Sequence, residues 1–164
     1  MTYIRSLISS LLMAILAAPL LAQGATVAFG TIEQDTSLPV EVTADNLSVD
    51  QATGTAVFTG NVLIGQGAMR LTAERVEVVY RAQAEGIAKL EATGGVTLVS
   101  GDDAAEADRA DYDIDAGTLV MTGNVLLTQG GSALSSEQMT IQLEDGTAQM
   151  SGRVKTILQT GSGN

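Results

Sequence analysis

The 164-residue chain repeats its own sequence, and this repetition constrains its fold more than any other feature. When the sequence is shifted by 63 residues, the 24 residues that begin at Ala44 align with the 24 that begin at Ala107, and 13 of the pairs are identical. Each copy divides again into two similar units, so four units follow one another. Units of this size bury an apolar face only by stacking on their neighbours, and the repeats therefore predict a fold that grows unit by unit.

Two short signals mark every unit. A small residue followed by an acidic residue opens the unit, at Ala44–Asp45, Ala73–Glu74, Ala107–Asp108 and Ser136–Glu137. A glycine with a valine two positions later follows, at Gly60, Gly94, Gly123 and Gly152. The second unit is five residues longer than the others. We expect its polar stretch, Arg81–Ile87, to form the loop that accommodates the extra length.

Apolar residues around each glycine recur with a period of two, which is typical of β-strands. Around the acidic residue, the apolar side chains lie two positions before the small residue and three and five positions after it. Their offsets from the small residue therefore change from even to odd within one segment. Side chains alternate strictly between the two faces of a strand. This change of parity therefore predicts a bulge or bend at the same place in every unit, where the strand turns a corner.

These patterns predict an all-β fold: a stacked-repeat β-jelly roll of about sixteen short antiparallel strands, open at both ends. The roll is expected over residues 38–158, after a flexible N-terminal segment at 23–37 and before a polar tail at 159–164. Its last strand, Thr147–Leu158, has little beyond Arg153 and Lys155 to protect a sheet edge from pairing with another chain.

Residues 1–22 are typical of a cleaved secretory signal peptide. Arg5 precedes an uncharged run from Ser6 to Leu21, and the small residue Ala22 stands where a signal peptidase would cut. A retained membrane anchor is the alternative, but the run is short against the roughly 20 residues that a spanning helix needs, and Pro19 interrupts it. No cysteine follows the run, which excludes a lipoprotein anchor. We expect export, with cleavage after Ala22 or within a few residues of it.

Composition excludes several classes of chemistry. The chain has no Cys, His or Trp, which excludes disulfides, Cys/His zinc sites, thiol nucleophiles and His-dependent triads. Its formal net charge of -11 would repel a phosphate backbone, so nucleic acid is a poor partner. The sequence contains no phosphate-binding glycine loop. We therefore expect no catalytic residues, no cofactor and no bound metal, and predict that the protein is not an enzyme.

The acidic stretch Asp102–Asp115 is the one cluster of carboxylates that suggests a metal site. Asp111, Asp113 and Asp115 imitate the start of an EF-hand loop, but Ala116 stands where that loop needs glycine and Thr122 where it needs glutamate. Alternation of aspartate with apolar residues favours the solvated face of a strand. Paired carboxylates on stacked strands would also suit a glycosidase, but the sequence singles out no pair.

The apolar face predicted for the roll is the candidate binding site. In a closed roll these residues are simply core, but the methionines among them are flexible enough to pack against a hydrocarbon partner. The residues that we assign to a lipid-binding groove are Phe58, Val62, Ile64, Val96, Leu98, Leu119, Met121, Val125, Leu127, Met139, Ile141 and Met150.

The segments PVEVTADNLSVDQATGTAVFTGNV and ADYDIDAGTLVMTGNV, together with the signal peptide, resemble the OstA-like family of lipopolysaccharide-transport proteins. The resemblance covers residues 38–158 and implies a V-shaped β-jelly roll in the periplasm of a Gram-negative cell. It implies that lipid A acyl chains enter the apolar interior and that copies join head to tail. It further implies contacts with the inner-membrane adaptor LptC and the outer-membrane translocon LptD. The acidic charge balance is a departure from the family, and it leaves only Arg70, Arg75, Arg109 or divalent cations to contact lipid phosphates.

We therefore expect a non-enzymatic periplasmic carrier, part of a bridge that moves lipopolysaccharide from the inner to the outer membrane. Two alternatives remain open. One is a membrane-anchored adaptor of the LptC type, which would retain residues 1–22. The other is an envelope β-solenoid that binds or cleaves a polysaccharide.

Overall fold

The computed structural model of the chain describes residues 25–28, 36–82 and 85–158. The predicted signal peptide and the predicted polar tail lie outside these residues. No helix in the described ranges is long and apolar enough to span a membrane.

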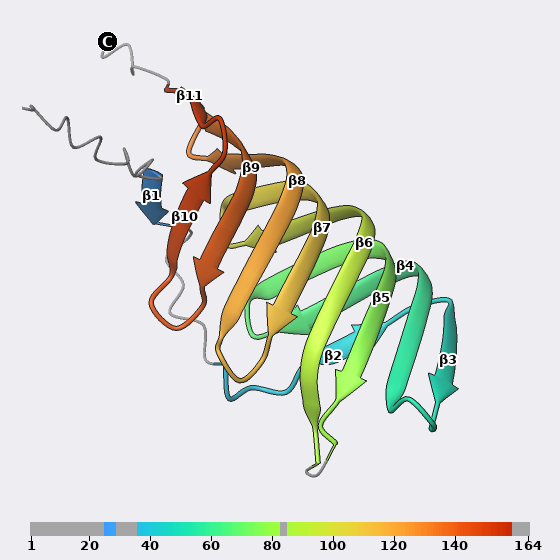
Figure 1. Cartoon of the computed structure of the whole chain (residues 1–164). Coiled ribbons are helices and arrows are strands. Elements are labelled where there is room, and N and C mark those ends of the chain that lie inside the picture. Colours follow the sequence, from blue (N-terminus) through green and yellow to red (C-terminus); the bar gives the residue numbers. More distant parts are fainter. Residues whose placement is uncertain (1–24, 29–35, 83–84, 159–164) are drawn as a thin grey trace, which may run out of the picture.

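Eleven antiparallel strands form a single sheet in the described part of the chain, which confirms the all-β prediction (Figure 1). Their order is β1-β10-β9-β8-β7-β6-β5-β4-β2, and in addition β3 pairs with β4 and β11 pairs with β9. The strands are β1 Ala25–Ala28, β2 Glu41–Thr43, β3 Asn46–Asp50, β4 Thr55–Gln66, β5 Met69–Tyr80, β6 Ile87–Ser100, β7 Asp103–Asp113, β8 Thr118–Gln129, β9 Ser132–Gln142, β10 Thr147–Ser151 and β11 Lys155–Ile157.

Each long strand passes through a bend near its middle, where the pairing register shifts. Between β4 and β5, Thr59 pairs with Arg75 and Val62 pairs with Ala73, so two residues of β4 lie opposite Glu74 alone. Because of the extra residue, the inward-facing positions of β4 have even numbers on both sides of the bulge, whereas those of β5 change from odd to even numbers. Register shifts recur at the equivalent place in the four following pairs of long strands, which confirms the predicted bends.

Positive backbone φ angles explain why glycine opens each bulge. Gly94 has φ +87°, and a Cβ atom there would lie 2.7 Å from Cβ of Glu74 on the neighbouring strand. The second bulge position also has positive φ, and in two units asparagine occupies it, at Asn61 and Asn124. The Nδ2 atom of Asn61 donates to the carboxylate of Asp45 at 2.8 Å, and Asn124 repeats this contact in the third unit. Asparagine tolerates this conformation better than most residues.

The described residues form eleven strands rather than the expected number of about sixteen, because the hydrogen-bond ladder resumes directly beyond most bends. A bent segment such as β4 therefore remains one strand on both sides of its bulge. Only the first and last segments separate at the bend, into β2 and β3 and into β10 and β11. The loop predicted at Arg81–Ile87 lies between β5 and β6, except that Ile87 is already the first residue of β6; residues 83–84 lie outside the described part of the chain.

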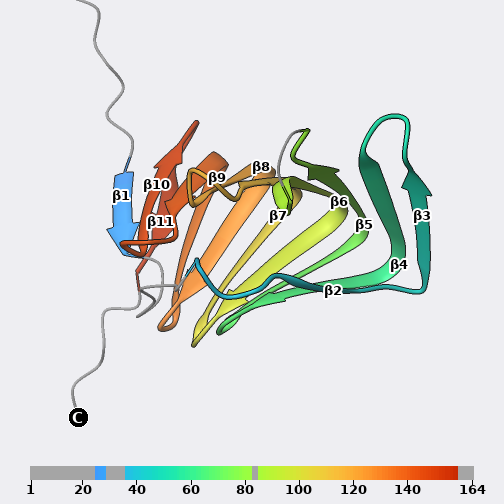
Figure 2. The same cartoon turned by 90° about the horizontal axis from the view of Figure 1, so that it is seen from below.

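The bends divide the roll into two arms that face each other (Figures 1 and 2). The first arm consists of β1, β3, β10 and residues 55–59, 75–80, 87–93, 109–113, 118–122 and 138–142. The second arm consists of β2, β11 and residues 62–66, 69–73, 96–100, 103–107, 125–129 and 132–136. We call the row of stacked bends the corner, and the opposite edge, where the turns of the two arms meet, the mouth.

The N-terminal strand changes two expectations. Residues 25–28, which were expected in a flexible segment, form β1 and pair with β10 from Ala25–Met150 to Ala28–Thr147. Val27 lies against the core, and this burial accounts for ordering of the strand. The C-terminal sheet edge is therefore covered on the first arm, whereas the edge of β11 on the second arm is exposed.

Candidate functional site

All twelve predicted groove residues face the interior of the roll, six on each arm. Eleven of them are at most 2% exposed, and Phe58 is half-buried against the core. The first arm supplies Phe58, Leu119, Met121, Met139, Ile141 and Met150, and the second arm supplies Val62, Ile64, Val96, Leu98, Val125 and Leu127. Their use by a lipid remains a prediction, but the fold brings them together on one continuous apolar surface.

Several interior residues were not among those predictions. Met69, the first residue of β5, and Leu143, in the turn after β9, are both buried. Gln66 is also buried, at 2% exposure. Its position six residues after Gly60 continues the inward-facing even spacing of that strand, so the same rule that placed Val62 and Ile64 inside was sufficient to find it.

The space between the arms is filled by side chains. Between the described parts of the two arms lies a cavity of about 10 Å³, close to the volume that one water molecule needs. Its lining is apolar and comes from both arms: Ile64, Met69, Leu71, Leu90, Ala92, Ala110, Tyr112 and Leu119. A hydrocarbon chain therefore enters this interior only if the arms move apart.

Polar groups at the mouth connect the arms. The hydroxyl of Tyr112, on the first arm, donates to Oε1 of Gln66, on the second arm, at 2.8 Å. Nε2 of Gln66 donates to the carbonyl oxygens of Thr36 at 3.1 Å and Leu38 at 2.9 Å. Burial raises the pKa of Tyr112, so its hydroxyl stays protonated at neutral pH and remains a donor.

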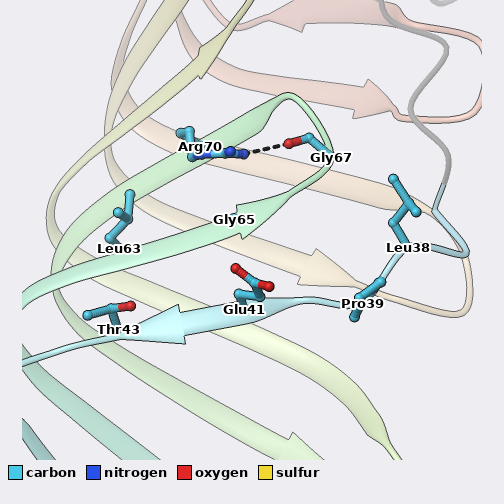
Figure 3. A pocket seen from close by; sticks show the side chains of 8 residues that line it. All are labelled: Leu38, Pro39, Glu41, Thr43, Leu63, Gly65, Gly67 and Arg70. Carbon is cyan, nitrogen blue, oxygen red and sulfur yellow. Dashed lines mark hydrogen bonds between the residues drawn. The ribbon is translucent and has the colours of Figure 1, made fainter.

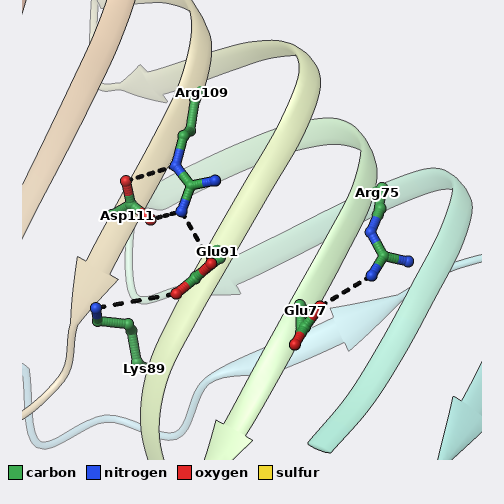
Figure 4. Close-up of polar contacts among 6 residues, drawn as sticks. All are labelled: Arg75, Glu77, Lys89, Glu91, Arg109 and Asp111. Atoms are coloured by element: carbon green, nitrogen blue, oxygen red, sulfur yellow. Dashed lines mark hydrogen bonds and ion pairs between the residues drawn. The ribbon is translucent and has the colours of Figure 1, made fainter.

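Asp111, in the acidic stretch, lies on the outer face of β7 beside Arg109 (Figure 4). Asp103, at the start of β7, is instead buried at 6% exposure and accepts a hydrogen bond from Gln129, so the solvated face predicted for the stretch does not include it. Arg109 contacts Asp111 at 2.6 Å and Glu91 at 2.9 Å, and these hydrogen bonds raise its pKa. Arg75 pairs with Glu77 at 2.9 Å. Among the described residues, no three acidic side chains gather closely enough to hold a metal ion.

A shallow hollow of about 330 Å³ lies on the outer face of the second arm (Figure 3). The missing side chain at Gly65 leaves room between Leu63, Glu41 and Arg70. Arg70 donates to the backbone carbonyls of Gly67 at 2.6 Å and Met69 at 2.7 Å. Of the three arginines considered for phosphate contacts, Arg75 and Arg109 are engaged by carboxylates, and Arg70 is engaged by backbone oxygens beside an acidic neighbour.

Comparisons with known proteins agree with this architecture. No curated protein sequence matches the chain. Among solved structures, the chain is similar to LptH, described as the LptA-homologous periplasmic component of the lipopolysaccharide transport device of Pseudomonas aeruginosa. The TM-score is 0.67 at 18% identity, and the match covers 77% of this chain and 99% of LptH. That likeness shows the fold.

A family model described as "LptA/(LptD N-terminal domain) LPS transport protein" matches residues 41–147. The matched segment runs from β2 to the start of β10 and includes all the complete bends between them. Because this segment is well over half of the chain, the protein belongs to the LptA/LptD N-terminal domain family of lipopolysaccharide transport proteins.

Proposed function

We propose that the protein is a periplasmic carrier that shields the acyl chains of lipopolysaccharide between its two arms and forms part of the bridge from the inner to the outer membrane. The observation that carries this proposal is the two-armed roll with an apolar interior that runs its whole length, in a chain of a lipopolysaccharide transport family. Sugars of the lipid would remain outside the mouth, in water.

The interior suits a disordered alkyl partner better than a rigid one. Its side chains are almost all aliphatic, and Met69, Met121, Met139 and Met150 are buried among them. Methionine has three rotatable bonds and a polarisable sulfur, so it repacks around a guest at low cost. Transfer of alkyl chains from water to such a surface is favoured by roughly 25 cal/mol for each Å² buried.

The two ends of the sheet suit contacts with further proteins of the bridge. Leu47 and Val49 on β3, and Ile157 on β11, are each more than half exposed. These strands lie at opposite ends of the roll and each has one unpaired edge in the described structure (Figure 1). Pairing between unlike edges is heterologous and extends into a chain rather than a closed ring. The adaptor LptC, the translocon LptD and further copies of this chain are the partners that we propose for these edges.

Photo-crosslinking in cells tests the carrier directly. A benzoylphenylalanine at Phe58 places the photoreactive group in the interior, where an aromatic side chain already fits. The same group at Val57, the preceding residue of β4, faces the opposite side of the sheet and is the matched control. We expect lipopolysaccharide adducts from position 58 and none from position 57. Equal adducts at both positions, or none at either, would contradict the proposal.

Two further measurements separate the alternatives. Mass spectrometry of the chain isolated from the periplasm distinguishes a processed carrier from an adaptor that retains residues 1–22. Competition of the crosslink by lipid A, but not by the delipidated polysaccharide, distinguishes a carrier of acyl chains from a polysaccharide-binding protein.

A further inference from the structure

The contact between Gln66 and Tyr112 is the starting point for an inference about how the interior opens. Both side chains are buried, at 2% exposure each, although they lie beside turns at the mouth. Their hydrogen bond joins strands that are not neighbours in the sheet, because Gln66 pairs with Met69 and Tyr112 pairs with Leu90 and Leu119. The bond therefore spans the mouth from one arm to the other.

The segment before β2 lies over the same point. Gln66 holds it through the carbonyl oxygens of Thr36 and Leu38. A Cβ atom on Gly117 would lie 3.8 Å from the side-chain methyl of Thr36, which places Thr36 against a turn of the first arm. Residues 36–38 thus contact both arms at the mouth.

A small void lies in the interior beneath this contact. The 10 Å³ cavity lies between the arms, and Tyr112 forms part of its lining together with Met69 and Ile64 of the second arm. Side chains around a void lose part of their dispersion contacts, so separation of the arms costs less there than across fully packed side chains. The polar contact thus closes the arms over the place where a guest chain enters most easily.

The repeat supplies an independent observation. Gln129 follows Gln66 by the 63-residue period of the sequence and ends β8 as Gln66 ends β4. Its Nε2 atom donates to the carbonyl oxygen of Ala28 at 2.8 Å and to Asp103 at 2.7 Å. Both repeated glutamines therefore hold backbone carbonyls of the N-terminal part of the chain at the mouth.

We propose that Gln66, Tyr112 and residues 36–38 form a latch that keeps the mouth closed in the empty protein and that releases when acyl chains enter. This inference rests on the proposed function, since it assigns a regulation to the same interior. The latch is built from neutral hydrogen bonds, which contribute little net free energy because water replaces them on opening. It is therefore weak enough for a lipid to open.

Two conservative variants weaken the latch from opposite sides. Gln66→Met keeps the length of the side chain but removes its donor and acceptor atoms, and Tyr112→Phe removes only the hydroxyl. The control Thr118→Val removes a side-chain hydrogen bond of 2.9 Å to Gln142, which joins neighbouring strands of one arm. Circular dichroism identifies the variants that remain folded.

Hydrogen exchange without lipid is the first measurement. We expect faster amide exchange at residues 36–43 in Gln66→Met and in Tyr112→Phe, and unchanged exchange in Thr118→Val. With lipopolysaccharide present, Tyr112→Phe, which loses one hydrogen bond, should take up lipid between about twofold and tenfold faster than the wild type. Gln66→Met loses that bond and the two bonds to Thr36 and Leu38, so its uptake should be accelerated at least as much. Unchanged exchange and unchanged uptake in folded latch variants would overturn the latch.

Crosslinking supplies the opposite perturbation. Because the chain has no cysteine, Ala68→Cys and Ala116→Cys introduce the only thiols, on exposed turns that flank the mouth. A bismaleimide between them should abolish lipid uptake. The control link joins Ala116→Cys to Glu144→Cys, on neighbouring turns of one arm, and should leave uptake unchanged. Normal uptake by the mouth-linked protein would also overturn the latch.

These measurements keep the two proposals apart. If the wild type and all variants fail to take up lipopolysaccharide, the proposed carrier function is refuted, and hydrogen exchange still decides whether the mouth is held by Gln66 and Tyr112. If lipid uptake is normal and amide exchange at residues 36–43 is the same in both latch variants as in the wild type, the proposed carrier function is supported and the latch is refuted.

Discussion

The bulge of the second unit permits a sharp test, because its two glycines differ in their surroundings. Gly94 and Gly95 both have positive φ, +87° and +73°. A Cβ atom on Gly94 would lie 2.7 Å from Cβ of Glu74, whereas nothing lies within 4 Å of a Cβ on Gly95. Gly95 also occupies the position that asparagine holds in the first and third units. We therefore predict that Gly94→Ala is strongly destabilising and that Gly95→Asn is tolerated.

The expected magnitudes follow from this geometry. Left-handed backbone conformation costs an alanine about 1–2 kcal/mol. Relief of the contact with Glu74 requires movement of packed backbone, for which overpacking costs of about 1–3 kcal/mol are typical. Reduced entropy of the unfolded chain offsets about 0.4–1 kcal/mol. Gly94→Ala should therefore lose about 3 kcal/mol of unfolding free energy, whereas Gly95→Asn should change it by less than about 1 kcal/mol.

Thermal and urea unfolding of the two variants measure the difference. For a roll of this size, the loss at Gly94 corresponds to a fall in Tm of about 10 °C. Gly95→Asn should melt close to the wild type, because its side chain can donate to Glu74 as Asn61 donates to Asp45. Equal stability of the two variants, or greater damage from Gly95→Asn, would refute the assignment of the close approach to the first bulge position.

Three further outcomes follow from the structure. One residue inserted after Asp108 should invert the inward and outward positions of β7 and cost several kcal/mol in urea unfolding, whereas the same insertion beside Asp145, in an exposed turn, should cost less than about 1 kcal/mol. Folding favours the protonated form of Tyr112, since the pKa of its hydroxyl is raised above 10.0 in the folded state. The stabilisation from this group is complete below pH 10 and is lost as the pH rises through the raised pKa. In alkaline melting curves, Tyr112→Phe should abolish this pH dependence. Leu47→Lys or Ile157→Lys should leave the melting temperature unchanged and lower self-association in sedimentation velocity, and a strictly monomeric wild type would contradict the edge pairing.

Sequence patterns predicted the parts of the fold that every unit repeats. The change of parity after the acidic residue located the bends. The even spacing from each glycine placed ten of the twelve groove residues inside, and the spacing from Ser136 placed Met139 and Ile141 there. The pairing of β1 with β10 was beyond the sequence, because Ala25–Ala28 lies outside the repeat and contains only one strongly apolar inward residue, Val27. A contact between segments more than a hundred residues apart leaves no periodic signal.

The contacts at the mouth show a second limit of prediction from the sequence. Parity placed both Gln66 and Tyr112 on the inner face, so their burial was predictable from the sequence. Their hydrogen bond was not, since it depends on how closely the arms approach, and residues 46 positions apart on different strands give no local evidence of that distance. Strand number was overestimated for a related reason, because the sequence shows where a strand bends but not whether its ladder continues.

The uniform bends also determine how the length of the roll can vary. Units in this chain recur every 29 residues, apart from the longer second unit, and each adds two strands to the sheet. Neighbouring strands are spaced about 4.8 Å apart, so one unit spans roughly 10 Å along the axis. Gain or loss of a unit by duplication or deletion would change the length by that step, while the cross-section and both terminal strands stay the same. The length of the roll can therefore change only in whole steps of one unit.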